Sequence, residues 1–212
     1  MIKFIARILV VLLWLPLVAS AQYLEGVEYQ TLANPQPVDT GAKIEVREFF
    51  WYGCPHCFAL EPYVEKWLRN EPKNATFVRT PAALNERWAI HARAYYAFQV
   101  LGLTAKLHRA FFDAIQVDRQ PLFDPESIAD FVAKHGGDRT AFLNAYRSFG
   151  VDSSVLKANQ LARAYNIDSV PTVIVDGKYL TNATLANGPE HVMDVVNFLV
   201  HKAAAERAAR KR

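Results

Sequence analysis

Glu48-Phe49-Phe50-Trp51-Tyr52-Gly53-Cys54-Pro55-His56-Cys57-Phe58 is the stretch that decides the fold of this chain. A strongly apolar run breaks at Gly53 and a helical pattern begins directly after it, so a Cys-x-x-Cys pair stands at a strand-to-helix junction. The two cysteines are the only two in 212 residues. Such a pair at such a junction is typical of a thioredoxin-like dithiol/disulfide site.

The two cysteines are expected to have different chemistry. Pro55 suits the first helical turn because its missing N–H would have no partner inside the helix. Cys54 is then expected at the N-cap, where unpaired N–H groups and the positive end of the helix dipole stabilise a thiolate. Cys57 lies one turn further in and should be more buried and less acidic. This asymmetry predicts Cys54 as the exposed nucleophile and Cys57 as the resolving thiol.

Two other uses of the cysteine pair are weaker. A structural disulfide across so short a loop would constrain the unfolded chain very little. A zinc site with His56 as a third ligand would need a second cysteine pair or suitably spaced histidines. The other histidines, none with matching spacing, are His91, His108, His135, His191 and His201. We therefore expect a redox pair, with no metal and no cofactor beyond the Cys54–Cys57 disulfide.

Residues 1–21 have the pattern of an export signal. Lys3 and Arg7 form a basic start, Ile8–Val18 is an apolar run, and Ala19-Ser20-Ala21 has the small residues of a cleavage site. We predict cleavage after Ala21. An uncleaved membrane anchor is the alternative, but this apolar run is short for a span of about 20 residues.

The charge balance argues against a nucleic-acid partner. The whole chain carries a formal net charge of +3, which falls to +1 without Lys3 and Arg7. The tail Lys202–Arg212 holds five basic residues and one acidic residue, so residues 22–201 carry about −3. Because the folded body lacks a basic footprint, we expect no nucleic-acid binding. The tail is expected to be a frayed helix end with solvated charges, with attraction to anionic lipid as the alternative.

The pattern of apolar, capping and turn residues predicts strands at both ends of the chain and helices between them. The expected strands are Tyr29–Leu32 at an edge, Lys43–Tyr52, Ala75–Thr80, Val170–Val175 and Lys178–Leu180. Asp176-Gly177 predicts a type I′ hairpin between the last two. A first helix is expected over Pro55–Arg69 and a last one from Gly188-Pro189-Glu190. The expected caps of the helices between them are Asn85, Thr104, Asp124, Asp138 and Ser153 or Ser154.

Taken in order, a βαβ unit comes first, an all-helical block interrupts it, and a ββα unit closes the chain. We therefore predict an α/β protein with a thioredoxin fold and an inserted all-helical domain. The predicted division is a signal peptide at 1–21, a discontinuous thioredoxin-like domain at 22–83 and 151–205, a helical insertion at 84–150 and a basic tail at 206–212.

These motifs together resemble the DsbA family of periplasmic thiol:disulfide oxidoreductases. The residues concerned are Phe49–Cys57, then Val170-Pro171-Thr172, then Asp176-Gly177-Lys178-Tyr179. Cys-Pro-His-Cys is similar to the family's active-site tetrapeptide, and Val170-Pro171 to its cis-proline loop. The likeness extends over essentially the whole mature chain, and the combination with the export signal and the insertion makes it specific.

The resemblance implies roles for particular residues. Cys54 matches the nucleophile, Cys57 the resolving cysteine, and Pro171 the cis-proline that faces the disulfide. A cis proline exposes the backbone of the preceding Val170, where an extended substrate segment can pair like an added strand. Glu48 matches a buried acid beneath the active site.

Two further expectations concern this site. In the family, a basic residue pairs with the buried acid that Glu48 matches. No residue of this sequence clearly matches that basic partner, and Arg79 approaches it only in sequence pattern. Pro55 and His56 are expected to modulate the active site, with His56 supplying a donor or positive charge to the Cys54 thiolate. Each unit by which that pKa falls is worth about 1.4 kcal/mol, or about 30 mV for a two-electron couple.

The resemblance also implies partners and a compartment. We expect a monomer in the periplasm that donates disulfides to reduced, unfolded exported proteins and is reoxidised by a DsbB-like membrane quinone oxidoreductase. One rival is a disulfide isomerase or reductase of the same fold, although isomerases of this type dimerise through an added N-terminal domain. The other is a non-catalytic periplasmic holdase chaperone.

Overall fold

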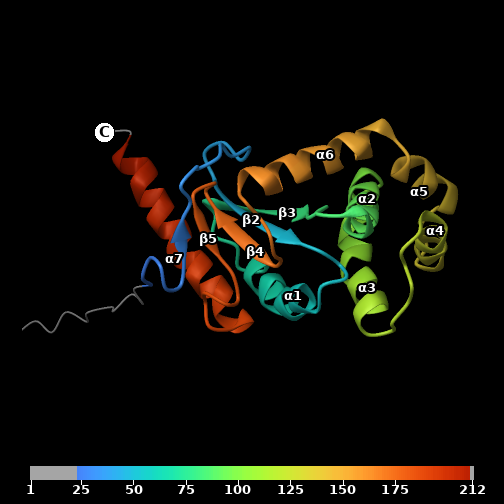
Figure 1. Cartoon of the computed structure of the whole chain (residues 1–212), viewed down its shortest axis with the longest axis horizontal. Coiled ribbons are helices and arrows are strands. Elements are labelled where there is room, and N and C mark those ends of the chain that lie inside the picture. The colour runs from blue at the N-terminus through green and yellow to red at the C-terminus, as the bar shows by residue number, and fades with distance from the viewer. Residues whose placement is uncertain (1–22, 211–212) are drawn as a thin grey trace, which may run out of the picture.

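A five-stranded mixed sheet forms the centre of the molecule (Figure 1). The structure, a computed structural model, describes residues 23–210, so the predicted signal peptide lies outside the described residues. The strands, in the spatial order β1-β5-β4-β2-β3, are β1 (Gln30–Thr31), β2 (Ile44–Phe50), β3 (Ala75–Pro81), β4 (Thr172–Val175) and β5 (Tyr179–Thr181). β2 runs parallel to β3 and antiparallel to β4. The sequence predicted all five strands, with differences at their ends.

Helices cover both faces of this sheet (Figure 1). Helices α1 (Pro55–Leu68) and α7 (Pro189–Ala209) pack against the face that carries Val46 of β2. Helix α6 (Phe149–Ala164) covers the opposite face, where Phe49 of β2 belongs to its core. Every residue of β2 is buried, and this includes its three charged residues Glu45, Arg47 and Glu48. Burial on both faces accounts for the continuous apolar run at the end of the strand, Phe49–Tyr52.

Four helices form the insertion between β3 and α6 (Figure 1). They are α2 (Glu86–Val100), α3 (Thr104–Gln116), α4 (Pro125–Lys134) and α5 (Arg139–Tyr146). Their aromatic core also takes in Phe50 and Tyr52, from the end of β2 and the residues just after it. The structure therefore confirms a thioredoxin fold with a helical insertion, and the Cys54 turn lies where the two parts meet.

Most of the predicted helix caps are confirmed. The side chain of Asn85 accepts from the Trp88 N–H, that of Asp124 from two N–H groups of the next turn, and that of Asp138 from the Ala141 N–H. The predicted cap at Thr104 is wrong, because the N-cap of α3 is Leu103 and Thr104 is already helical.

The predicted start of α6 at Ser153 or Ser154 is wrong. Ser148 caps this helix by accepting a hydrogen bond from the Val151 N–H at 3.3 Å, and the helix begins at Phe149. Gly150 therefore lies in the first turn instead of ending the preceding helix. The division between 84–150 and 151–205 stays a prediction, with its boundary inside α6.

The predicted hairpin at Asp176-Gly177 is confirmed. Both residues have positive φ, 55° and 65°, and the Lys178 N–H donates to the Val175 carbonyl at 3.0 Å. Both features define a type I′ turn. Gly177 is also required for packing, because a Cβ there would come within 2.1 Å of the Gln36 carbonyl oxygen.

The expectation of a frayed, solvated tail is wrong as far as the structure describes it. Helix α7 continues to Ala209. Glu206 accepts hydrogen bonds from Lys178 and from the Tyr179 hydroxyl, and Arg207 pairs with Asp176 of the hairpin. The end of α7 is thus attached to the β4–β5 hairpin by charged side chains. Among residues 23–210, none of the helices combines the length and hydropathy that a bilayer crossing requires.

We predict that deleting residues 206–212 lowers the free energy of unfolding by about 1 kcal/mol, because the deletion removes these partly buried ion pairs. Urea unfolding of the reduced protein measures the effect. The matched control is Arg210→Ala, which changes a charge of the same tail outside these pairs. Equal stability of the truncated and full-length proteins would support a solvated tail instead.

Candidate active site

The turn between β2 and α1 positions the two cysteines. Cys54 is the N-cap residue of α1 and Pro55 occupies its first turn, as predicted. The Cys54 N–H donates to the Trp51 carbonyl at 3.0 Å, and the Cys54 carbonyl accepts from the Phe58 N–H at 3.1 Å. Gly53 permits this turn, since a Cβ at that position would lie 2.2 Å from the Trp51 ring.

The two sulfurs differ as the sequence suggested. Both cysteines are thiols, so this is the reduced form of the site. Cys54 is only 8% exposed, so the expectation of an exposed nucleophile is wrong, although Cys57 is more buried still, with no exposed surface. A hydrogen bond from the Cys57 thiol, together with the N–H groups of Cys57 and His56 and the charge of His56, lowers the pKa of Cys54 to about 6 despite its burial. Burial and the neighbouring Cys54 raise the pKa of Cys57 well above its ordinary value.

The loop before β4 brings Val170 to the nucleophile. The Val170–Pro171 peptide bond is cis, and the Cys54 Sγ donates to the Val170 carbonyl at 3.3 Å. Residues 116 positions apart in the sequence thus meet at the reactive sulfur. His56 and Pro55, by contrast, are exposed on the first turn of α1.

A cleft of about 560 Å³ adjoins the cysteine turn on the side of the insertion. Trp51, Pro55 and Phe58 form its wall on the thioredoxin side. Trp51 stacks on Trp88 of α2 with ring centroids 4.6 Å apart. Arg87, Gln116, Arg119 and Gln120 also line this cleft. The cleft therefore places an aromatic wall beside the cysteine turn, with basic and amide side chains around it.

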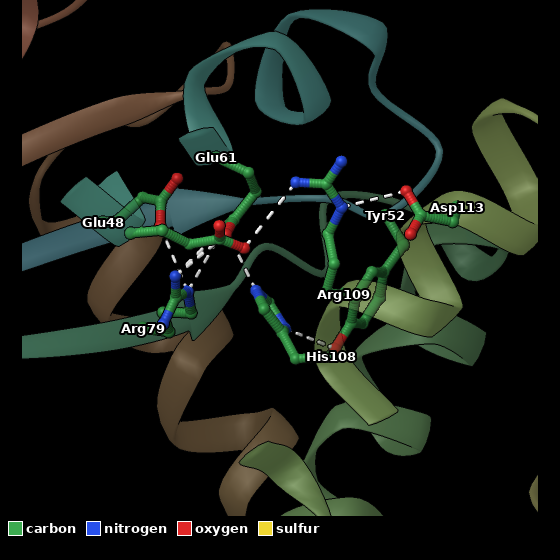
Figure 2. Close-up of polar contacts among 8 residues, drawn as sticks. Glu48, Tyr52, Glu61, Arg79, His108, Arg109 and Asp113 are labelled. Atoms are coloured by element: carbon green, nitrogen blue, oxygen red, sulfur yellow. Dashed lines mark hydrogen bonds and ion pairs between the residues drawn. The ribbon is translucent and has the colours of Figure 1, made fainter. Parts of the chain in front are cut away.

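A buried polar cluster joins β2, β3, α1 and α3 through Glu48, Arg79, Glu61 and His108 (Figure 2). Glu48 of β2 is directly opposite Arg79 of β3 in the parallel register. The Arg79 Nε lies 3.6 Å from a Glu48 carboxylate oxygen, and its guanidinium contacts Glu61 of α1 at 3.0 Å. Arg79 is thus the basic partner of Glu48 for which the sequence offered no clear candidate.

The two carboxylates of this cluster are held in opposite states. Burial and the charge of Glu61 raise the pKa of Glu48 to about 8, against the opposing effect of Arg79. Burial also acts to raise the pKa of Glu61, but a hydrogen bond from His108 and the charge of Arg79 outweigh it and lower that pKa. Glu48 in turn contributes to the raised pKa of Cys57. The site therefore stores a proton on Glu48 close to the buried thiol.

Helix α3 supplies two contacts that the sequence did not indicate. His108 donates to or accepts from Tyr52 and Glu61, with ring nitrogens 2.8 and 3.1 Å from their oxygens (Figure 2). The Gln116 side chain donates to the Tyr52 carbonyl at 2.7 Å. Glu61 alone had a signal in the sequence, because it follows Cys57 by four residues and so lies on the same helix face.

The comparisons with known proteins agree on one family. The sequence profile described as the DSBA-like thioredoxin domain matches residues 80–194. The chain is 40% identical over 190 residues to the thiol:disulfide interchange protein DsbA of Pseudomonas aeruginosa, covering 90% of this chain and 89% of that protein. It is 42% identical over 184 residues to the DsbA of Azotobacter vinelandii, with 87% and 85% covered.

Solved structures give the same result. The crystal structure of Pseudomonas aeruginosa DsbA is similar with a TM-score of 0.83 at 40% identity, covering 90% of this chain and 97% of that one. The reduced DsbA1 of Neisseria meningitidis has a TM-score of 0.79 at 29% identity, with 89% and 99% covered.

The ranking of the groups that lower the pKa of Cys54 can be tested by substitution. Cys57→Ala removes the strongest donor and should raise this pKa by at least about one unit. Cys57→Ser keeps a hydroxyl donor and should raise it less, and His56→Leu should have the smallest effect. Ultraviolet absorbance of the thiolate, followed against pH, measures all three. A larger shift in His56→Leu than in Cys57→Ala would contradict the ranking.

Proposed function

The chain belongs to the DsbA family of thiol:disulfide oxidoreductases, and on this premise we propose that it donates its Cys54–Cys57 disulfide to reduced, newly exported proteins. The observation that carries the proposal is the asymmetry of the two sulfurs. One thiol has a lowered pKa and contacts the Val170 carbonyl, and the other is buried with a raised pKa. Such a pair suits an exchange in which Cys54 bonds to the client and Cys57 is the leaving sulfur.

The proposed reaction has two displacement steps. A client thiolate attacks the Cys54 Sγ, the disulfide breaks, and Cys57 leaves as a thiolate. A second client thiolate then attacks the client sulfur of this mixed disulfide and releases Cys54 as a thiolate. The client loses two electrons and the cysteine pair gains them. Because the buried Cys57 thiolate is unfavourable, it takes a proton, and protonated Glu48 is the group placed to supply it.

The pKa of Cys54 sets the direction of exchange. A group whose folded pKa is depressed stabilises the folded reduced protein above its unfolded pKa, and this stabilisation is lost as pH falls through the folded value. With a folded pKa of about 6 and an ordinary value of 9.0, part of this stabilisation is present at pH 7. It favours the reduced form, so the oxidised protein should act as an oxidant.

The surroundings of Cys54 support binding of an extended client segment. The Val170 backbone before Pro171 is the proposed pairing edge, because added strands bind through main-chain hydrogen bonds. The aromatic cleft beside Pro55 offers apolar surface for client side chains on the other side of the sulfur. We assign modulation of the Cys54–Cys57 pair to Pro55, His56 and Glu48. Substrate binding is assigned to Val170 and Pro171.

Family membership supports the proposed partners and compartment. We place the protein in the periplasm after cleavage at Ala21, with reoxidation by a DsbB-like membrane quinone oxidoreductase. The rival isomerase or reductase would need a less stabilised Cys54 thiolate. The rival holdase would use the apolar cleft without the thiols.

We predict that Cys57→Ser accumulates mixed disulfides through Cys54 with client proteins that already contain a disulfide. The Cys54 thiolate attacks the client disulfide, one client cysteine leaves as a thiolate, and no Cys57 thiol remains to release the new bond. Cys54→Ser should trap none and should lose oxidation of a reduced client. Non-reducing electrophoresis and mass spectrometry identify the bonded cysteine. The double serine variant is the control for the holdase: if it still supports client folding as well as the unsubstituted protein does, the oxidase assignment fails.

A further inference from the structure

A chain of polar contacts links the helical insertion to the buried acid Glu48 (Figure 2). Starting from the insertion, His108 on α3 contacts Glu61 on α1 at 3.1 Å. Glu61 contacts the Arg79 guanidinium on β3 at 3.0 and 3.2 Å. Arg79 in turn lies 3.6 Å from Glu48 on β2. All of these side chains are at most 15% exposed.

The hydrogen-bond roles of His108 follow from its neighbours. Burial lowers the pKa of His108, so the ring is neutral and carries one proton. The ionised Glu61 carboxylate can only accept, so the proton must be on Nε2. Nδ1 then accepts from the Tyr52 hydroxyl at 2.8 Å, and burial keeps that phenol protonated by raising its pKa. A single tautomer satisfies both contacts.

The charges of the cluster do not balance without a proton. Two buried carboxylates, Glu48 and Glu61, share one guanidinium, and two buried negative charges beside one positive charge are unfavourable. One proton on the pair removes the excess. The negative charge is more stable on Glu61 than on Glu48, because Glu61 accepts hydrogen bonds from both Arg79 and His108. Neither oxygen of Glu48 has a hydrogen-bond partner among residues 23–210.

We propose that His108 is a positioning residue for disulfide exchange: its Nε2–H holds Glu61 as the charged partner of Arg79 and so leaves the shared proton on Glu48. This inference rests on the proposed function, in which Glu48 protonates the departing Cys57 thiolate. Through His108, the helical insertion thus influences the protonation of Glu48, although both reacting sulfurs belong to the thioredoxin-like domain. His108 acts through Glu61 and Arg79 and does not touch the sulfurs itself.

Other titratable groups also face this cluster, and their states fit the assignment. Cys57 faces Glu48 from α1, and Tyr95 faces it from α2 with its pKa raised by burial to about 12. Glu65 of α1 acts on His108 from the solvent side, where it pairs with Arg109 at 3.6 Å. At neutral pH the Cys57 thiol and the phenols of Tyr52 and Tyr95 remain protonated. The proton that can move is therefore the one shared by Glu48 and Glu61.

Two amide substitutions separate the two ring nitrogens of His108. A glutamine places its amide N–H near the position of Nε2 and can still donate to Glu61. An asparagine places its amide near Nδ1, where it can reach Tyr52 but not Glu61. The two variants are of similar polarity, so a difference between them reports the donor to Glu61.

The measurement is the carbon-13 chemical shift of the Glu48 carboxyl against pH, with the pH profile of the single-turnover reaction between the oxidised protein and a reduced peptide. We expect His108→Gln to resemble the unsubstituted protein. His108→Asn should move both profiles to lower pH by about one unit or more, because a hydrogen bond to a charged group is lost from Glu61. Equal profiles for the two variants, whether shifted or unshifted, would overturn the proposal.

His91→Gln is the matched control for packing in the insertion. His91 is also buried, but its Nε2 contacts the Leu122 carbonyl and not the cluster. This variant should leave the Glu48 titration unchanged, and an equal shift would show that loosened packing is the cause. If His108→Asn does not fold, Glu61→Gln provides the second test: it releases Arg79 to Glu48 and must lower the pH of the Glu48 titration.

The outcome is distinguishable from a failure of the proposed function. Trapping of clients by Cys57→Ser does not depend on His108. Successful trapping together with equal profiles in the two amide variants would overturn the role of His108 alone. Absence of trapping would remove the oxidase assignment whatever the Glu48 titration shows.

Discussion

Arg79 is a single positive charge placed between two buried carboxylates, and the active site depends on how that charge is shared. Moving a carboxylate out of water is costly unless it is paired and hydrogen-bonded. Glu61 is paired by Arg79 and accepts from His108, whereas Glu48 is left at 3.6 Å from the guanidinium. The result is an ionised acid on α1, Glu61, and a protonated acid on β2, Glu48. The protonated one lies on the side of Cys57, the sulfur that must leave as an unstable buried anion.

The two sulfurs show the same contrast between an ionised and a protonated group. Cys54 sits at the N-terminus of α1 and receives a hydrogen bond from Cys57, so it loses its proton readily. Cys57 is enclosed by apolar groups and keeps its proton. The insertion maintains this arrangement by holding Tyr52, two residues before Cys54, through His108 and Gln116. The fold and the chemistry are therefore connected at one short segment, from the end of β2 to the first turn of α1.

The sequence was sufficient for the parts of the structure that depend on local signals. Capping residues, the Asp176-Gly177 turn and the apolar run Phe49–Tyr52 each specify their own conformation, and the strands and most helices were predicted from such signals. The start of α6 was missed because Gly150 is a turn signal that Ser148 overrides. The polar cluster was missed because it depends on strand register and on helix packing. Arg79 reaches Glu48 only through the β2–β3 pairing, and no pattern in the sequence connects His108 to Glu61.

The protonation states of Cys54 and Cys57 determine how many protons accompany the two electrons at neutral pH, and the pH dependence of the redox potential measures that number. The equilibrium potential of the Cys54–Cys57 pair should be measured in glutathione buffers from pH 5 to 8. With Cys54 ionised and Cys57 protonated, one proton is taken up, and the potential should fall by about 30 mV per pH unit near pH 7. Below the Cys54 pKa of about 6 the slope should steepen to about 59 mV per unit. A slope of about 59 mV per unit at pH 7 would mean that both thiols are protonated, and it would contradict the account.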